Sequence, residues 1–233
     1  MQGGIISYGL LAGLAIALVW AAYTDLKRRQ IDNGLNLAIA AAAPLYWWAS
    51  GMTPIAAAWQ LGLALLVFAV CAVLFALRQM GGGDVKLLSA LALWIAPGDF
   101  TRLCVIMALV GAALSVLAGV RNMRRDDSRA TGTALAWAAA GVWILLSAYV
   151  LFVMAGGQPP RLGEAFVRVA GPAAAAWLAG LTLLAVLGAT AVGTLQIVRR
   201  QATRLPIPYG VAIALAGLWL IAIGDVPALQ VAV

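Results

Sequence analysis

The sequence has 233 residues, of which 64% are hydrophobic and 10% are charged, and its mean hydropathy is +1.00. Soluble domains are roughly 45–50% apolar and 25% charged, so this composition excludes a soluble domain and indicates a membrane protein. The net charge of +7 does not indicate nucleic-acid binding, because the arginines cluster between apolar runs without interleaved aromatic residues. Histidine is absent and the two cysteines lie inside apolar runs, which excludes a histidine base and a Cys/His zinc site and leaves carboxylates as the acid and base groups.

Apolar runs of membrane-spanning character recur along the whole chain. They cover residues 5–23, 34–50, 55–77, 85–97, 102–120, 133–155, 172–198 and 207–224. Since a bilayer span needs about 20 apolar residues, the runs predict an all-α, polytopic transmembrane helix bundle of about eight spans. The first run lacks a positive segment before it and is expected to be a retained span. The fourth is short, and its helix is expected to start slightly below the membrane surface or beside a water-filled cleft. Tryptophans near the run ends, Trp94 among them, are expected to form an aromatic belt.

The basic residues predict how these spans are oriented. If the N-terminus lies outside and the spans alternate, twelve of the 15 Lys and Arg residues fall on one face, and only Arg102, Arg161 and Arg168 fall on the other. The positive-inside rule makes the richer face cytoplasmic, so both termini are expected outside. Asp25 and Asp84 then lie on the cytoplasmic face.

Asp25 ends the first run and is followed directly by basic residues, Lys27, Arg28 and Arg29. A carboxylate at this depth costs free energy unless it forms an ion pair, is hydrated or has a functional role. A salt bridge to one of these neighbours is the structural explanation, and a catalytic role is the functional one.

Asp84 follows three consecutive glycines, Gly81, Gly82 and Gly83, and opens an apolar run. Glycine permits backbone angles closed to other residues and lets another backbone approach closely, so the cluster can present Asp84 at a cleft and admit an extended peptide. Asp84 can instead be a helix cap, since an acid is favourable at a helix N-terminus. A cap explains Asp84 but does not explain three glycines.

The two acids are far apart in sequence but share one predicted membrane face. Two carboxyls in contact cannot both ionise easily, so one keeps its proton near neutral pH while the other is charged. That state suits peptide hydrolysis, because the ionised carboxyl draws a proton from water and the protonated one polarises the scissile carbonyl. No metal or other cofactor is expected.

Three motifs in this order resemble those of the type IV prepilin peptidases. Gly81 to Asp84 match the G-x-G-D motif of intramembrane-type aspartyl proteases, and with Lys86, Leu87 and Leu88 they resemble the family's GGGDVKLL form. Asp25, Ile31 and Asn33 are similar to the family's D-x5-I-P-N stretch, and Pro208, Tyr209 and Gly210 to its PYG-x-A-I segment. The resemblance covers roughly residues 10–120 and 205–224. Asp32 stands where the family usually has proline, so it is either a third acid near the site or, as we favour, a loop acid or helix cap.

The resemblance implies site residues and a substrate. Asp25 and Asp84 are the implied catalytic pair, and Gly81, Gly83, Lys86 and Asn33 are implied to shape the site or bind substrate. The implied partners are the lipid bilayer and pilin-like precursors with short basic leaders, which are cut at the cytoplasmic face of a bacterial inner membrane. The chain lacks the cysteine quartet of the long forms that also N-methylate, so it resembles the short forms of tight-adherence (Flp) pilus systems.

The whole chain, residues 1–233, is expected to be a single integral membrane domain. Within it we expect a peptidase core at 1–120, a two-span insertion at 121–204 and a final span and tail at 205–233, because the short forms usually have six spans. Two other functions stay open. One is a small proton- or cation-coupled transporter, in which the acids relay charge. The other is a non-catalytic membrane assembly protein.

Overall fold

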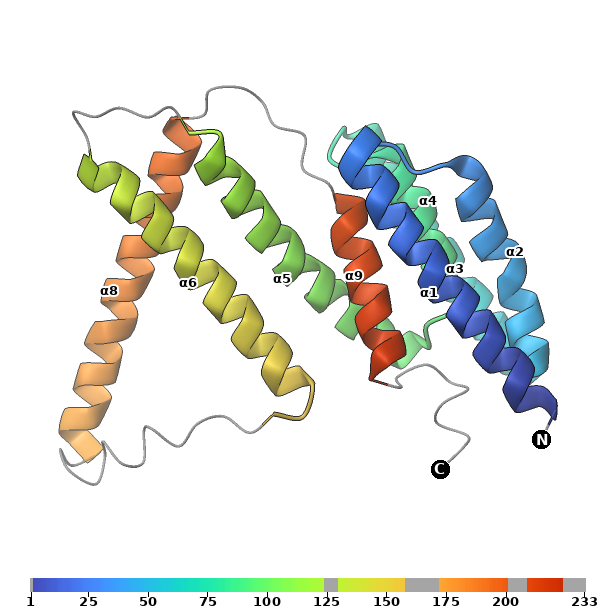
Figure 1. Cartoon of the computed structure of the whole chain (residues 1–233). Coiled ribbons are helices and arrows are strands. Elements are labelled where there is room, and N and C mark those ends of the chain that lie inside the picture. The colour runs from blue at the N-terminus through green and yellow to red at the C-terminus, as the bar shows by residue number, and fades with distance from the viewer. Residues whose placement is uncertain (1, 124–129, 158–171, 201–208, 224–233) are drawn as a thin grey trace. The chain divides into compact units, whose positions relative to one another are not determined.

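A computed structural model describes residues 2–123, 130–157, 172–200 and 209–223. Across these ranges the chain forms helices and no strand, which confirms the all-α prediction. Figure 1 shows the helices in chain order, and their bounds are α1 (Gln2–Arg28), α2 (Asn33–Ala49), α3 (Pro54–Ala76), α4 (Gly82–Leu91), α5 (Pro97–Arg121), α6 (Ala130–Met154), α8 (Pro172–Arg199) and α9 (Tyr209–Ala222).

Five of the described helices are long and apolar enough to cross a membrane. They run over Gly4–Arg28, Pro54–Ala76, Pro97–Arg121, Thr133–Met154 and Gly180–Arg199. The predicted number of eight spans is therefore not confirmed. The shortest of the described helices, α4, has 10 residues, and at 1.5 Å per residue it covers about 15 Å, half of a hydrocarbon core of about 30 Å.

The chain divides into two compact units. The first comprises Met1–Gly111 and Pro208–Val233, and the second comprises Ala112–Ile207. The second contains α6 and α8, which pack closely: a Cβ at Gly193 would lie 2.5 Å from the Cβ of Ala139. The predicted division into a core, an insertion and a final span stays a prediction.

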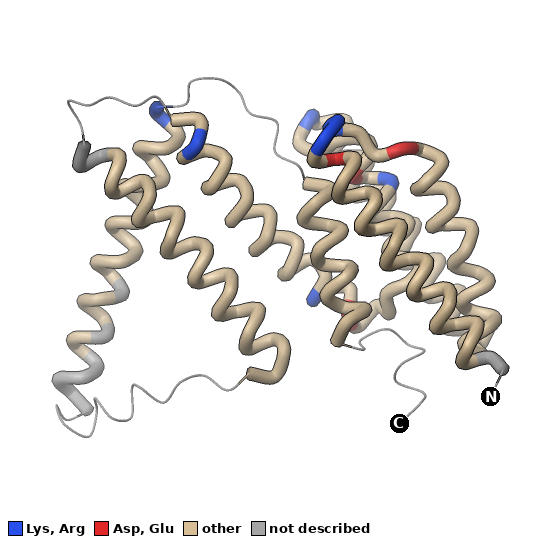
Figure 2. Tube along the Cα trace, viewed as in Figure 1, with Lys and Arg blue, Asp and Glu red and all other residues tan. Residues whose placement is uncertain are grey.

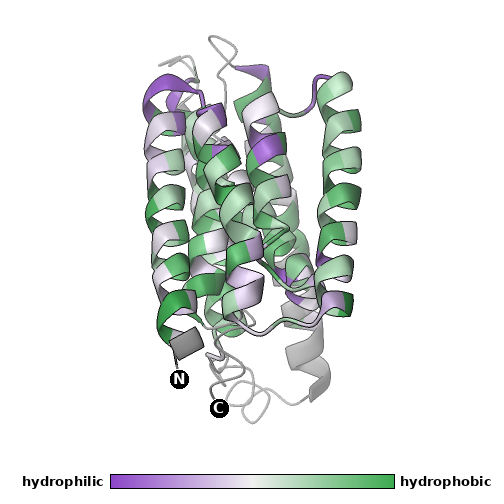
Figure 3. Cartoon of the chain, turned by 90° about the vertical axis from the view of Figure 1, so that its right-hand side faces the viewer, coloured by the Kyte–Doolittle hydropathy of each residue, from purple (hydrophilic) through white to green (hydrophobic). Residues whose placement is uncertain are grey.

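Helix α4 is the centre of the first unit, where it contacts α2, α3 and α9. Its Leu87 and Leu91 side chains are fully buried. Figure 3 shows apolar residues along the middle of the helices and polar residues toward their ends. The short helix is thus surrounded by protein rather than by lipid along much of its surface.

The turn that follows α4 is held by side chains from neighbouring helices. Gln60 Nε2 donates to the carbonyl oxygens of Ala92, at 2.6 Å, and of Ile95, and Trp47 Nε1 donates to that of Leu93 at 2.8 Å. Irregular backbone at membrane depth is tolerated only where such groups are satisfied within the protein. The helix can therefore end after 10 residues.

Trp94, in the same turn, corrects one prediction. Its side chain is 2% exposed, it stacks on Tyr46, and its Nε1 donates to the Ile39 carbonyl at 2.9 Å. An aromatic belt requires side chains at the lipid–water boundary. The prediction of a belt position is therefore wrong for Trp94, which is a core residue.

Charges in the first unit gather at the end where α1 ends and where α2 and α4 begin (Figure 2). Lys27 and Arg28 are in the last turn of α1, whereas Asp99 opens α5 and pairs with Arg102 at 3.6 Å. Arg161 and Arg168, assigned to the outer face from sequence, lie outside the described residues. We refer to the end formed by the C-terminus of α1 and the N-termini of α2 and α4 as the basic end.

Candidate active site

A polar cavity of about 360 Å³ lies at the basic end. Its lining comes from the end of α1, the loop before α2 and the glycine-rich start of α4. The lining residues are Asp25, Arg29, Gln30, Ile31, Asp32, Asn33, Gly81, Gly82, Gly83 and Asp84. The structure thus brings Asp25 and Asp84 to one cavity, which we call the acid cavity.

Asp25 lies in the last turn of α1 and is 7% exposed. Its Oδ2 accepts a hydrogen bond from the backbone N–H of Val211 at 3.3 Å. Val211 is in the first turn of α9, where backbone N–H groups have no helical acceptor and the helix dipole favours an anion. The N-terminus of α9 therefore stabilises a carboxylate at Asp25.

The salt-bridge explanation for Asp25 is not supported by its basic neighbours. Among the described residues, no Lys or Arg nitrogen lies within 4.0 Å of the Asp25 carboxylate oxygens. Lys27 instead donates to the Tyr23 hydroxyl at 3.1 Å. Asp25 is held by the helix terminus and not by an ion pair.

Gly210 permits this contact between α9 and Asp25. A Cβ at Gly210 would lie 2.9 Å from Asp25 Oδ2 and 2.6 Å from Ile31 Cδ1. Both distances are too short for a real side chain. The absence of a side chain at this position lets α9 approach the carboxylate.

Asp84 lies in the first turn of α4, for which Gly81 is the N-cap residue. The Gly81 backbone N–H is hydrogen-bonded to the Asp84 carboxylate, and a Cβ at Gly81 would lie 3.0 Å from Asp84 Oδ2. This is the geometry of an acid at the third helical position that reaches back to the cap. Asp84 therefore makes a capping contact and also lines the acid cavity.

The surroundings of Asp84 favour its protonated form. Burial raises the pKa of Asp84, the nearby Asp25 charge raises it further, and the Gly81 N–H opposes both, so that the pKa lies at about 6. An ordinary aspartate has a pKa near 3.8. Asp84 can therefore hold a proton at a pH close to neutral.

The three glycines before Asp84 provide close approach rather than unusual backbone angles. Among the described glycines, only Gly51 and Gly156 have positive φ, so the cluster does not use the backbone angles that glycine alone readily permits. A Cβ at Gly82 would lie 3.3 Å from the Phe75 ring, and one at Gly83 would lie 3.3 Å from Ile31 Cβ. The start of α4 therefore fits tightly against α3 and the loop before α2.

All the residues that line the acid cavity lie in a part of the chain that matches a known family. Residues 12–120 match the model of the type IV leader peptidase family. This segment, which is 109 of the 233 residues, is similar to the type IV leader peptidase family. The match confirms the resemblance over residues 12–120, a segment that contains both aspartates, and does not extend to the resemblance at residues 205–224. No curated protein and no solved structure matches the chain. The family match and the five long apolar helices together indicate a multi-pass membrane protein.

Two further residues that the resemblance implicated meet at the rim of the acid cavity. Lys86 Nζ donates to Asn33 Oδ1 at 2.7 Å. Asn33 is the first residue of α2 and lines the acid cavity, whereas Lys86 lies on α4 just outside it. The bond connects the starts of α2 and α4 beside the two acids.

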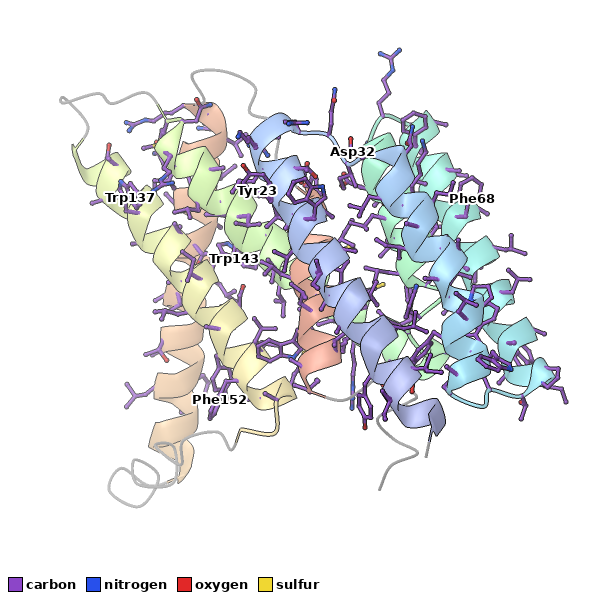
Figure 4. The ribbon with its side chains drawn as sticks, turned by 45° about the vertical axis from the view of Figure 1, so that its right-hand side comes forward. Tyr23, Asp32, Phe68, Trp137, Trp143 and Phe152 are labelled. Carbon is purple, nitrogen blue, oxygen red and sulfur yellow. The ribbon has the colours of Figure 1, made fainter. Side chains whose placement is uncertain are left out.

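Asp32 also lines the acid cavity. It occupies the N-cap position of α2 with extended backbone angles, but its side chain makes no capping hydrogen bond. Figure 4 shows it on the loop that leads into α2. Asp32 therefore has the position of a cap while its exposed carboxylate remains available to the cavity.

Sequence reasoning did not assign roles to Ile31, Gly210 or Val211. Ile31 is 8% exposed and packs on both Gly83 and Gly210. The available signal was the Tyr209–Gly210 pair, which opens the last apolar run and places a residue without a side chain at a helix start. Pro208, which precedes it in the same motif, lies outside the described residues.

Proposed function

We propose that this chain is a membrane aspartyl endopeptidase that removes the short basic leader from pilin-like precursors at the cytoplasmic membrane face. Asp25 and Asp84 act as a dyad that activates water. The observation that carries the proposal is that both carboxylates, 59 positions apart in sequence, line one cavity. The match to a peptidase family adds the reaction class.

The surroundings of the two acids suggest different roles. Asp25, which accepts the Val211 N–H, is the ionised base that takes a proton from water. The resulting hydroxide oxygen bonds to the scissile carbonyl carbon, and protonated Asp84 donates its proton to the carbonyl oxygen. When the C–N bond breaks, the proton on Asp25 passes to the leaving amine and the hydroxyl proton of the intermediate returns to Asp84. The dyad is then restored.

The charge of the acid cavity fits a basic leader. Three carboxylates line it, those of Asp25, Asp32 and Asp84, against one guanidinium, that of Arg29. Even with one carboxyl protonated, the cavity is negative and attracts lysine and arginine side chains. A leader that lies on the cytoplasmic side would reach the basic end of the first unit without crossing the bilayer.

The test compares isosteric variants of the two acids. Asp25→Asn and Asp84→Asn are each co-expressed with a panel of pilin-like precursors, and leader loss is followed by gel shift. We expect both variants to insert into the membrane and neither to cleave a precursor that the unchanged chain cleaves. Asp99→Asn is the matched control, because Asp99 pairs with Arg102 away from the acid cavity.

Three outcomes would reject the proposal. Normal cleavage by either variant would show that the dyad is not catalytic. Failure of the unchanged chain on every precursor would favour a non-catalytic assembly role. Ion flux through the protein in vesicles, lost in both variants, would favour the transporter.

A further inference from the structure

An apolar groove of about 490 Å³ begins at the rim of the acid cavity. It lies between α2, α3 and α4, and we call it the apolar groove. Asn33 lines both the acid cavity and the groove, and Lys86, its hydrogen-bond partner, lines the groove. The two spaces are therefore neighbours that share one rim.

One stripe from each of three helices forms the apolar groove. The stripes run from Asn33 to Ala40 on α2, from Leu61 to Phe68 on α3 and from Lys86 to Ala90 on α4, and Leu93 adds to the last one from the turn after α4. The stripes on α2 and α3 each span seven positions, the spacing of residues on one helix face, and thus about 10 Å along the helix. The groove consequently runs along the helix axes, away from the acid cavity.

The wall contributed by α3 is apolar and open. Leu61, Leu65 and Phe68 are 49%, 61% and 51% exposed, and Figure 4 shows Phe68 on α3. Since α3 is long and apolar enough to cross a membrane, we expect these side chains to face hydrocarbon. An apolar helix or an acyl chain can enter from that side.

Asn36 distinguishes between these two kinds of occupant. It lies one turn after Asn33, lines the groove and is 5% exposed. Within the described part of the chain, neither its Oδ1 nor its Nδ2 has a hydrogen-bond partner. A buried amide without partners is costly, and it needs both a donor and an acceptor. A polypeptide backbone supplies both, whereas an acyl chain supplies neither.

We propose that the apolar groove binds the start of the precursor's apolar segment, which the resemblance to the type IV prepilin peptidases implies directly after the bond that is cut, and that Asn36 hydrogen-bonds the non-helical backbone there. This inference rests on the proposed peptidase function and adds a substrate-binding site to it. The basic leader lies in the acid cavity, the chain passes Asn33, and the apolar segment continues down the groove. Near the cut bond, backbone N–H and C=O groups that are not part of a helix need a hydrogen-bond partner such as Asn36, because no water is available to them inside a membrane.

Site-specific photocrosslinking tests which molecule occupies the groove. A benzophenone amino acid is placed at Leu61 or Phe68, with Ile16 on α1, 71% exposed and outside the groove, as the control. The chain carries Asp84→Asn so that the precursor stays uncut, and the precursor is one that the unchanged chain cleaves. We expect crosslinks from Leu61 and Phe68 to the start of the precursor's apolar helix, and none from Ile16.

The identity of the crosslinked products tests the groove as a substrate site independently of the peptidase function. Adducts with lipid alone, adducts with a second copy of the chain, or equal labelling from Ile16 would each overturn the groove as a substrate site. In those cases cleavage by the unchanged chain would leave the peptidase function standing. If the unchanged chain cleaves no precursor, both proposals fail.

Substitutions that alter the groove give a second, kinetic test. Asn36→Leu removes the unpartnered amide at nearly constant volume, and Ala40→Phe fills the groove. We expect KM to rise roughly tenfold with kcat little changed, the signature of lost ground-state binding. Ala41→Phe, on an exposed position of the same helix outside the groove, should leave KM unchanged.

Thermal stability separates a binding role of Asn36 from a structural one. Because the amide has no partner within the described residues, Asn36→Leu should keep or raise Tm while KM rises. A lower Tm with an unchanged KM would show that Asn36 serves the fold, and would overturn its assignment to the substrate.

Discussion

The backbone N–H of Val211 donates a hydrogen bond to Asp25, although 186 positions separate the two residues. The donor belongs to the first turn of α9, and the acceptor belongs to the last turn of α1. Helices α1 and α9 pack along their lengths: Gly217 lies so close to Leu18 that a Cβ there would be 2.9 Å from its Cδ1. The geometry of one acid of the proposed dyad thus depends on the last described helix.

Gly210→Ala tests this dependence. The added methyl would lie 2.6 Å from Ile31 Cδ1 and 2.9 Å from Asp25 Oδ2, so α9 or Asp25 must move. We expect cleavage to fall about 100-fold, since a 1 Å displacement in a catalytic site has that order of effect, and the free energy of unfolding to fall by about 1–3 kcal/mol. Gly34→Ala is the control, because a Cβ there meets no atom within 4 Å. Equal activity in both variants would contradict the role of Gly210.

The pKa of Asp84 predicts how cleavage depends on pH. In the proposed mechanism Asp84 must be protonated, and its pKa is raised to about 6. The protonated fraction therefore falls as pH rises above 6, and kcat/KM should fall about tenfold per pH unit between pH 7 and pH 8. Initial rates of leader loss in detergent, measured across this range, give the profile. A rate that stays constant from pH 6 to pH 8 would exclude Asp84 as the protonated partner.

The same shift predicts how stability depends on pH. The folded-state pKa of Asp84, about 6, is above the ordinary value of 3.8, so the folded state binds the proton more tightly than the unfolded state. The stability contributed by the protonated group is fully present below pH 3.8 and is lost as pH rises to 6 and beyond. Asp84→Asn should therefore raise Tm at pH 8, by about 2–4 °C, and change it little at pH 4. A variant that is less stable at pH 8 would contradict this assignment.

The hydrogen bond between Lys86 and Asn33 can be tested by a double-mutant cycle. The two side chains are 2.7 Å apart at the rim shared by the acid cavity and the apolar groove. Asn33→Ala and Lys86→Met should each reduce kcat/KM, and the double variant should lose less than the sum, with a coupling of about 0.5–3 kcal/mol. Additive losses would mean that the two residues act independently of this bond.

Gln60 is expected to be essential for stability but not for chemistry. Its amide donates to the carbonyls of Ala92 and Ile95, and Gln60→Leu leaves both buried acceptors without that donor. We expect the free energy of unfolding to fall by about 2–4 kcal/mol, measured by denaturation in detergent micelles. Gln79→Leu, at an exposed position, should change it by less than about 0.5 kcal/mol. An unaffected Gln60→Leu variant would show that other groups satisfy the turn.

The helical fold class and the common location of the two acids could be predicted from the sequence, because both depend on simple patterns. Hydropathy locates apolar helices, and alternating spans with a basic face bring Asp25 and Asp84 to one side. The family match contains both residues. Their catalytic role and the cytoplasmic location of the basic end stay predictions.

Other features could not be read from local sequence because they depend on distant neighbours. The apolar run at 85–97 gives no sign that α4 ends at Leu91, since the groups that stabilise the turn, Gln60 and Trp47, come from other helices. A glycine required by a close contact looks the same in sequence as one required by a positive φ. The identity of the contacting residue, Phe75 or Ile31, decides between them.

The hydrogen bond from Val211 to Asp25 also has a consequence for biosynthesis. A ribosome that adds about 5–20 residues per second needs about 10–40 s to extend the chain from Asp25 to Val211. During that time Asp25 and Asp84 are already made, but the amide group that holds Asp25 does not yet exist. Nascent chains therefore lack the complete site until Val211 has been added and α9 can form, long after both acids have been synthesised.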